Sequence, residues 1–170
     1  IKHMNSNIKS KEIRGNIQTR LEKLKKEQLD GIILAKSGLI RMGLDHVVTE
    51  SLNVNDFVPS PGQGILCIEC LSKNDFVIKR IKKVVHVDTE ICGAAERIFA
   101  RNMDGDCLSP IGAHAVIEKN LLTITGYVAS IDGTKFIKNK VSGKKDAYEE
   151  LAEDLSDVFI KMGSKRMLKC

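Results

Sequence analysis

The chain has 170 residues, of which 42% are hydrophobic, so it can bury the core of one ordinary domain or of two small ones. Lysine and arginine number 27 against 22 acidic residues, and the resulting net charge of +5 favours anionic partners only weakly. No apolar run approaches the roughly 20 residues needed to span a bilayer. Aromatic residues make up 4% of the chain and tryptophan is absent, which disfavours a surface that stacks nucleic-acid bases. Composition therefore predicts that the protein binds neither a membrane nor nucleic acid.

The cysteines indicate a reducing compartment, and hence the cytoplasm. They are Cys67, Cys70, Cys92, Cys107 and Cys170. An odd count at irregular spacing argues against a disulfide framework. Cys67 and Cys70 form a CxxC pair, but no second pair exists to complete a zinc site. We therefore expect no metal, and we interpret both thiols as packed side chains of a buried strand.

The first part of the chain alternates strand-like and helical patterns. Thr19 and Glu22 have the spacing of a capping box, which predicts that a helix begins at Thr19. Strand, helix, strand and helix in this order indicate an α/β arrangement with parallel strands and a right-handed crossover. The predicted segments are a strand at 7–13, a helix from Thr19, a buried strand at 32–35, and short helices at Ser37 and at 45–52.

Three arginines follow a predicted strand or begin a predicted helix: Arg14, Arg20 and Arg41. Open parallel sheets bind ligands at the carboxyl ends of their strands, next to helix N-termini. An arginine in the first turn of a helix opposes the helix dipole, so it brings no local benefit. The three side chains are therefore either ordinary surface residues or an anion-binding group at one sheet edge.

The second part of the chain predicts a small α+β domain with its own core. A linker at 53–60 leads into a strand at 65–71, and a boundary follows at 73–75. The Asp132–Gly133 pair is a strong hairpin signal between the last two strands. The predicted segments are an amphipathic helix at 88–103, strands at 113–118, 121–130 and 134–141, and a helix at 146–161 that stops at Gly163.

One cysteine occupies an unusual position. Cys107 lies within "MDGDCLSPIG", residues 103–112, where acids, glycine, serine and proline predict an exposed turn. A structural cysteine is more often buried in a strand or on a helix face. The position of this thiol therefore indicates a chemical role.

Several segments together resemble the porphobilinogen deaminase (hydroxymethylbilane synthase) family. They occur in family order over almost the whole chain, which makes the set far more specific than any single segment. The matching segments are "IRGNIQTRLEKL" (13–24), "DGIILAKSGLIRMGL" (30–44), "PSPGQGILCIEC" (59–70), "AERIFARNMDGDCLSPIGAHA" (95–115) and the Asp132–Gly133 hairpin.

The resemblance implies an enzyme of tetrapyrrole and heme biosynthesis that polymerises four porphobilinogen molecules into hydroxymethylbilane and releases ammonia. It implies a dipyrromethane cofactor bound through a thioether to Cys107. The residues implied to bind cofactor and substrate carboxylates, or to offer backbone to them, are Arg14, Arg20, Arg41, Gln63 and Ala35.

The resemblance also implies the domain organisation. Residues 1–58 correspond to the end of a second domain with a periplasmic-binding-protein-like parallel sheet, 59–74 to a strand that returns to a first domain, and 75–170 to a third, α+β domain that carries the cofactor. The family's catalytic aspartate lies in an N-terminal portion that these residues do not include, so we expect this chain to be inactive alone. That N-terminal half is an expected partner, and the complete enzyme is expected to be a monomer.

Three positions depart from the family pattern. Asp106 stands where glycine usually precedes the cysteine, and a neighbouring carboxylate disfavours the thiolate. Gln18 and Pro61 are tolerable variations.

Two alternative functions remain. One is a non-enzymatic small-anion-binding module of the two-lobed transport-protein type, which has no need of a thiol at Cys107. The other is a basic interaction protein, which the sparse aromatic residues disfavour.

Overall fold

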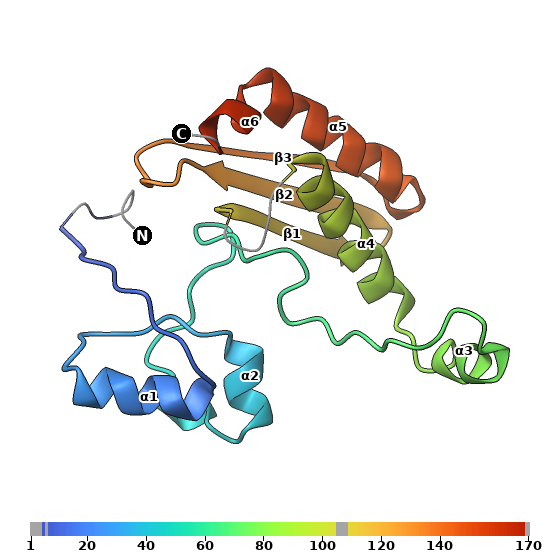
Figure 1. Cartoon of the computed structure of the whole chain (residues 1–170). Coiled ribbons are helices and arrows are strands. Elements are labelled where there is room, and N and C mark those ends of the chain that lie inside the picture. The colour runs from blue at the N-terminus through green and yellow to red at the C-terminus, as the bar shows by residue number, and fades with distance from the viewer. Residues whose placement is uncertain (1–4, 6, 105–108, 169–170) are drawn as a thin grey trace. The chain divides into compact units, whose positions relative to one another are not determined.

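The computed structural model describes residues 5, 7–104 and 109–168 (Figure 1). The chain divides into two compact units, Ile1–Asn53 and Val54–Cys170, and each is described by itself. In the described part of the chain, no helix is long and apolar enough to cross a membrane.

The first unit is built from short helices joined by extended chain. Its elements are α1 (Ile17–Lys26), α2 (Lys36–Arg41) and the 3-10 turn η1 (Asp45–Val47). Helix α1 begins two residues earlier than predicted, because Asn16 is its cap: the Asn16 side-chain oxygen accepts bonds from the Thr19 N–H at 2.8 Å and from the Thr19 hydroxyl at 2.9 Å. The predicted capping box at Thr19 is therefore wrong.

Helices α1 and α2 approach each other at Gly38. A Cβ atom at this position would lie only 2.9 Å from Ile17 Cδ1, so the absence of a side chain permits the contact. Leu39, on the next position of α2, is the one residue of this unit that is buried among those described. The unit therefore has a small apolar centre, and most of its side chains remain in contact with solvent.

The second unit contains a three-stranded antiparallel sheet in the order β1-β2-β3. Figure 1 shows α4 and α5 on the same face of this sheet. The elements are α3 (Asp75–Ile81), α4 (Val87–Asn102), β1 (Ile111–Glu118), β2 (Leu121–Ala129), β3 (Phe136–Lys144), η2 (Lys145–Ala147), α5 (Tyr148–Lys161) and α6 (Ser164–Met167). The predicted α+β domain is thus confirmed, whereas η2 and α6 were not predicted.

The predicted hairpin at Asp132–Gly133 joins β2 to β3. Its ends are closed by the bond from Ser130 N–H to the Lys135 carbonyl at 2.9 Å. The Asp132 carboxylate accepts bonds from the Ser130 hydroxyl at 2.6 Å and from the Thr134 N–H at 3.0 Å. These bonds lower the pKa of Asp132 to about 2, because they stabilise its charged form.

The core of the second unit lies between the sheet and helices α4 and α5. Phe99 and Phe159 are fully buried and meet edge to face, with ring centroids 4.9 Å apart. Gly126 on β2 makes room for both rings. On α5, the side chains of Leu151, Leu155 and Phe159 are buried, whereas Val158 and Met162 are exposed.

The strands predicted at 7–13, 32–35 and 65–71 do not form. Residues 5 and 7–104 contain no strand, so the predicted parallel sheet is not observed. A strand needs a neighbour that completes its backbone hydrogen bonds, and no described segment supplies one here. The segment 65–71 is instead exposed at Leu66 (72%) and Leu71 (79%). Cys67 and Cys70 are exposed with it, so the prediction of two packed thiols is wrong.

Candidate functional site

The first turn of α1 brings Arg14 and Arg20 to the same loop. Arg20 donates through Nε to the Gly15 carbonyl at 2.7 Å, one residue after Arg14. Gly15 has a φ of 125°, which a residue with a side chain rarely adopts, and a Cβ there would lie 2.9 Å from Thr19 Cγ2. A glycine is thus required where the chain turns between the two arginines.

The two guanidinium groups differ in their surroundings. Arg14 pairs with Glu12 at 2.8 Å, but 79% of its side chain is exposed, so this pair contributes little stability. Arg20 is half-buried, and within the described residues its two terminal nitrogens make no hydrogen bond. A planar guanidinium with both terminal nitrogens available can bind a carboxylate through two parallel bonds.

Ala35 and Arg41 lie at opposite ends of α2. Ala35 is the N-cap, and its carbonyl accepts the bond from Gly38 N–H at 3.0 Å. Arg41 is the last residue of the helix, where the partial negative charge of the free carbonyl groups stabilises a positive side chain. The prediction that Arg41 follows a strand or begins a helix is therefore wrong. About 9 Å of helix rise separates the two residues.

Gln63 belongs to the second unit and lies in a tight turn. Its N–H donates to the Ser60 carbonyl at 3.0 Å, and its side-chain oxygen accepts from the Ser60 N–H at 3.3 Å. The residues on either side, Gly62 and Gly64, have φ values of 75° and 89°. Glycines at these positions allow the compact turn, which presents an exposed Gln63.

A buried carboxylate, which the sequence analysis missed, holds this turn. Glu96 of α4 is only 4% exposed, and its Oε2 accepts a bond from the Gly62 N–H at 2.7 Å. Burial raises the pKa of Glu96, and this effect is opposed by the bonds from Ala115 and Gly62. Its signal in the sequence is an acid on the inward face of α4, next to Ala95 and one turn before Phe99.

Cys107 and Asp106 lie outside the described residues, but described residues before and after them make hydrogen bonds within the second unit. Before them, Met103 is buried and accepts a bond from the Ser164 hydroxyl at 3.4 Å through its sulfur. After them, the Pro110 carbonyl accepts the bond from the Ala129 N–H at 3.0 Å. Met103 is therefore bonded to α6, and Pro110 is bonded to β2.

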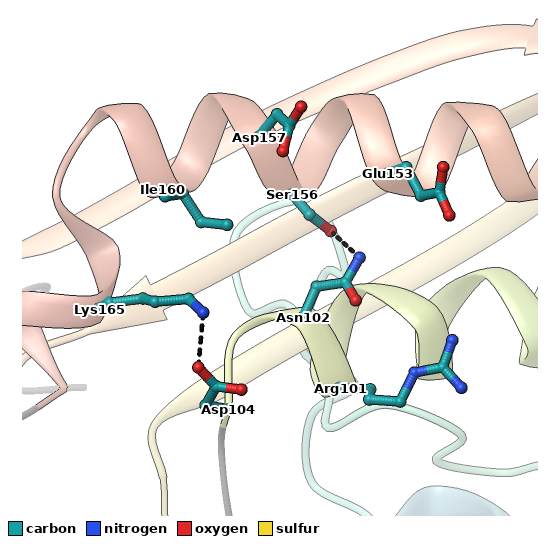
Figure 2. Close-up of a pocket in the computed structure, with 8 residues that line it drawn as sticks. All are labelled: Arg101, Asn102, Asp104, Glu153, Ser156, Asp157, Ile160 and Lys165. Atoms are coloured by element: carbon teal, nitrogen blue, oxygen red, sulfur yellow. Dashed lines mark hydrogen bonds and ion pairs between the residues drawn. The ribbon is translucent and has the colours of Figure 1, made fainter.

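A groove of about 590 Å³ lies beside Asp104, between the C-terminal parts of α4 and α5 (Figure 2). Figure 2 shows the ion pair between Lys165 and Asp104, at 2.5 Å, and the bond from Asn102 to the Ser156 hydroxyl, at 3.3 Å. Charges of both signs line the groove, so it has no clear preference for an anionic or a cationic ligand. Within 5, 7–104 and 109–168, no three His, Cys, Asp or Glu side chains form a group that could hold a metal ion.

Comparison with known proteins matches two domains of one family, one after the other along the chain. Residues 1–79 match the porphobilinogen deaminase "dipyromethane cofactor binding domain", and residues 90–161 match the porphobilinogen deaminase C-terminal domain.

Curated relatives named porphobilinogen deaminase agree with both matches. The protein of Clostridium botulinum strain Kyoto is 45% identical over 149 residues, which are 88% of this chain and 50% of the relative. The protein of C. botulinum strain 657 is 43% identical over 161 residues, 95% of this chain and 54% of the relative. That of Pelobacter propionicus is 38% identical over 167 residues, 98% and 54%. The chain spans about half the length of the curated relatives it matches.

The matches define a chain in which a sequence match to a cofactor-binding domain, at 1–79, precedes one to a C-terminal domain, at 90–161, and the second match contains the small α+β fold. This order and the agreement of the relatives identify its family. The chain belongs to the porphobilinogen deaminase family, as the resemblance implied.

Proposed function

We propose that this chain is the C-terminal half of an enzyme that polymerises four porphobilinogen molecules into hydroxymethylbilane with release of ammonia. The observation that carries the proposal is the pair of family matches, which cover 1–79 and 90–161 in order. We propose further that the family's catalytic aspartate belongs to an N-terminal part outside these 170 residues.

Cys107 is the proposed attachment residue for the dipyrromethane cofactor. When bound, this group supplies the primer on which the pyrrole chain grows. A thiol suits the attachment because its sulfur would add to the electrophilic methylene carbon left when ammonia departs, forming a stable thioether, while the thiol proton would pass to the pyrrole nitrogen. Met103 and Pro110, which flank the position in the sequence, are bonded to Ser164 and Ala129 of the second unit, which is the part that we propose carries the cofactor.

The arginines are the proposed partners of the acetate and propionate groups of cofactor and substrate. The arrangement of Arg14 and Arg20 around Gly15 supports this role, because it places two cations on one loop. Arg41, the Ala35 backbone and the exposed Gln63 are further proposed contacts. Charge-assisted paired bonds to arginine would select carboxylated pyrroles over neutral ones.

The segments 7–13 and 32–35 are proposed to become strands of the second domain's periplasmic-binding-protein-like parallel sheet in the longer protein, and 65–71 is proposed to become the strand that returns to the first domain. Exposed apolar side chains support this, among them Ile33 (48%), Leu66 (72%) and Ile68 (58%). Parallel sheets are covered on both faces, so such side chains would be buried there.

The test is cofactor attachment in the full-length enzyme. The wild-type protein, incubated with porphobilinogen, should gain the mass of a dipyrromethane and turn over the substrate. Cys107→Ser should lose both the adduct and the turnover, while the matched variants Cys67→Ser and Cys70→Ser should keep the adduct. An adduct that persists on Cys107→Ser would refute the assignment, and a wild-type enzyme that neither gains the adduct nor consumes porphobilinogen would refute the function.

A further inference from the structure

Glu96 connects three parts of the second unit. Its Oε2 accepts a bond from the Gly62 N–H at 2.7 Å, and its Oε1 accepts one from the Ala115 N–H of β1 at 2.8 Å. Because Glu96 itself lies on α4, one side chain joins a helix, an edge strand and the turn that carries Gln63.

A carboxylate in this position is costly unless its oxygens are satisfied. Only 4% of Glu96 is exposed, and burial of a charge without partners is strongly unfavourable. Each oxygen of Glu96 accepts a backbone N–H, and His114 Nδ1 lies 3.9 Å from Oε1. Such a buried and fully bonded group holds its partners in a defined position.

Among the described residues, the turn makes few other hydrogen bonds to the body of the unit. Just before it, the Pro59 carbonyl accepts the Ala113 N–H at 2.9 Å. Within the turn, the bonds of Gln63 to Ser60 are local and cannot fix its place on the unit. The bond from Gly62 to Glu96 is therefore the hydrogen bond that ties the residue next to Gln63 to a helix.

We propose that Glu96 is a positioning residue that holds the turn at residues 60–64 against α4 and thereby orients Gln63. The ligand-contacting role of Gln63 rests on the proposed function, whereas the anchoring role of Glu96 rests on its own contacts. The two can be tested separately.

The anchoring is tested by hydrogen exchange in the Glu96→Gln variant of this chain. The glutamine has the same shape, but it has one oxygen acceptor, and its NH2 group would face an N–H donor. We expect the Gly62 amide to exchange about tenfold faster or more. Glu118→Gln, which removes the same charge from an exposed position on β1, should leave it unchanged. Unchanged exchange at Gly62 in Glu96→Gln would overturn the proposal.

The orientation of Gln63 is tested in the full-length enzyme with Glu96→Gln, Gln63→Ala and the double variant. If Glu96 acts through Gln63, each single variant lowers kcat/KM for porphobilinogen and the double variant is no worse than Gln63→Ala. Losses that simply add would overturn the orienting role, since a purely structural residue gives that result. Normal kcat/KM in Gln63→Ala would instead refute the ligand contact assumed in the proposed function, while faster exchange at Gly62 would still support the anchor.

Discussion

The charged residues of this chain differ in burial and in how many of their polar atoms are already bonded within the protein. Glu96 is buried and both of its oxygens accept backbone N–H groups, so its role is structural. Arg14 pairs with Glu12 in an exposed position, where the pair contributes little stability, while Arg20 uses a single nitrogen to hold the Gly15 carbonyl. These two arginines therefore retain the capacity to bind a ligand at small cost to the fold.

The arginines are predicted to act on ligand carboxylates rather than on folding. In the full-length enzyme, Arg14→Leu, Arg20→Leu and Arg41→Leu should each weaken cofactor loading or stall elongation, because loss of one partner of a charged pair that is buried when the ligand is bound costs about 2–5 kcal/mol. Arg→Lys should restore only part of the activity, since a point charge cannot form two parallel bonds. The measurements are turnover, enzyme-bound intermediates on native gels and melting of the cofactor-free protein. Normal turnover in all three variants, or melting that falls with activity, would contradict this prediction.

Gly126 is predicted to be intolerant of a side chain. A Cβ there would lie 2.7 Å from Phe99 Cζ and 3.1 Å from Phe159 Cε2, inside the packed core. Gly126→Ala should therefore lower the free energy of unfolding by about 1–3 kcal/mol, measured by denaturant titration. At the control position Gly31, a Cβ would meet nothing within 4 Å, and Gly31→Ala should change stability by less than about 0.5 kcal/mol. Equal effects of the two variants would show that the Phe99 and Phe159 rings can move to accommodate the added methyl group at little cost in stability.

At the scale of elements, a sequence pattern predicted the correct helix or strand where the segments that pack on it lie nearby in the sequence. Helices α4 and α5 show a helical repeat of apolar residues, and each packs on strands close to it in sequence. The hairpin was predicted from Asp132 and Gly133 alone, because their turn chemistry is local. The strands predicted at 32–35 and 65–71 failed, because an apolar run specifies burial but not the neighbour that provides it.

The hairpin between β2 and β3 is predicted to weaken in acid through Asp132. Its pKa is lowered from 3.8 to about 2 by bonds from the Ser130 hydroxyl and from the N–H and hydroxyl of Thr134. The contribution of this group to stability is therefore complete above pH 3.8 and is lost as the pH falls through about 2.

Asp132→Asn keeps the shape of the side chain but removes its charge. The variant should melt at a lower temperature than wild type at pH 7, and its melting temperature should fall less between pH 4 and pH 2. Thermal unfolding over this pH range checks both statements. Asp154→Asn, an exposed position on α5, is the control and should retain the wild-type acid dependence. Identical pH profiles for wild type and Asp132→Asn would mean that the hairpin bonds do not favour the carboxylate.

The residues of the candidate site were predictable only where their role depends on neighbours in the sequence. Cys107 was identified by its turn residues and the arginines by their positions along the chain, which are local features. Arg41 was misplaced because the length of α2 decides whether it opens or ends the helix. The role of Glu96 was not predicted, because its bonds join residues 34 and 19 positions apart and only the tertiary fold brings them together.

At the scale of the whole molecule, this chain alone is predicted to have no deaminase turnover. The reaction needs a proton-transfer group, which we assign to the part of the enzyme outside these residues. Glu96, the one buried acid among the described residues, has both oxygens engaged by backbone N–H groups and is not available as a substitute. Assays of the 170-residue chain should show no consumption of porphobilinogen above buffer. Ammonia release by this polypeptide alone would show that another acid can serve.

The segment 65–71 is predicted to be covered in the full-length enzyme, and its thiols report on this directly. In the present structure Cys67 is exposed and lies between Leu66 and Ile68, which are 72% and 58% exposed. If this segment becomes a strand of a sheet covered on both faces, alkylation of Cys67 should slow by about tenfold or more relative to the 170-residue chain. Cys92 is the internal control: it is half-buried, and its pKa is raised by burial and by the nearby carboxylates of Glu96 and Asp88, so it should react slowly in both proteins. Peptide mapping after timed exposure to iodoacetamide gives both rates in one experiment. Equal rates for Cys67 in the two proteins would show that the segment stays exposed and that the proposed strand does not form.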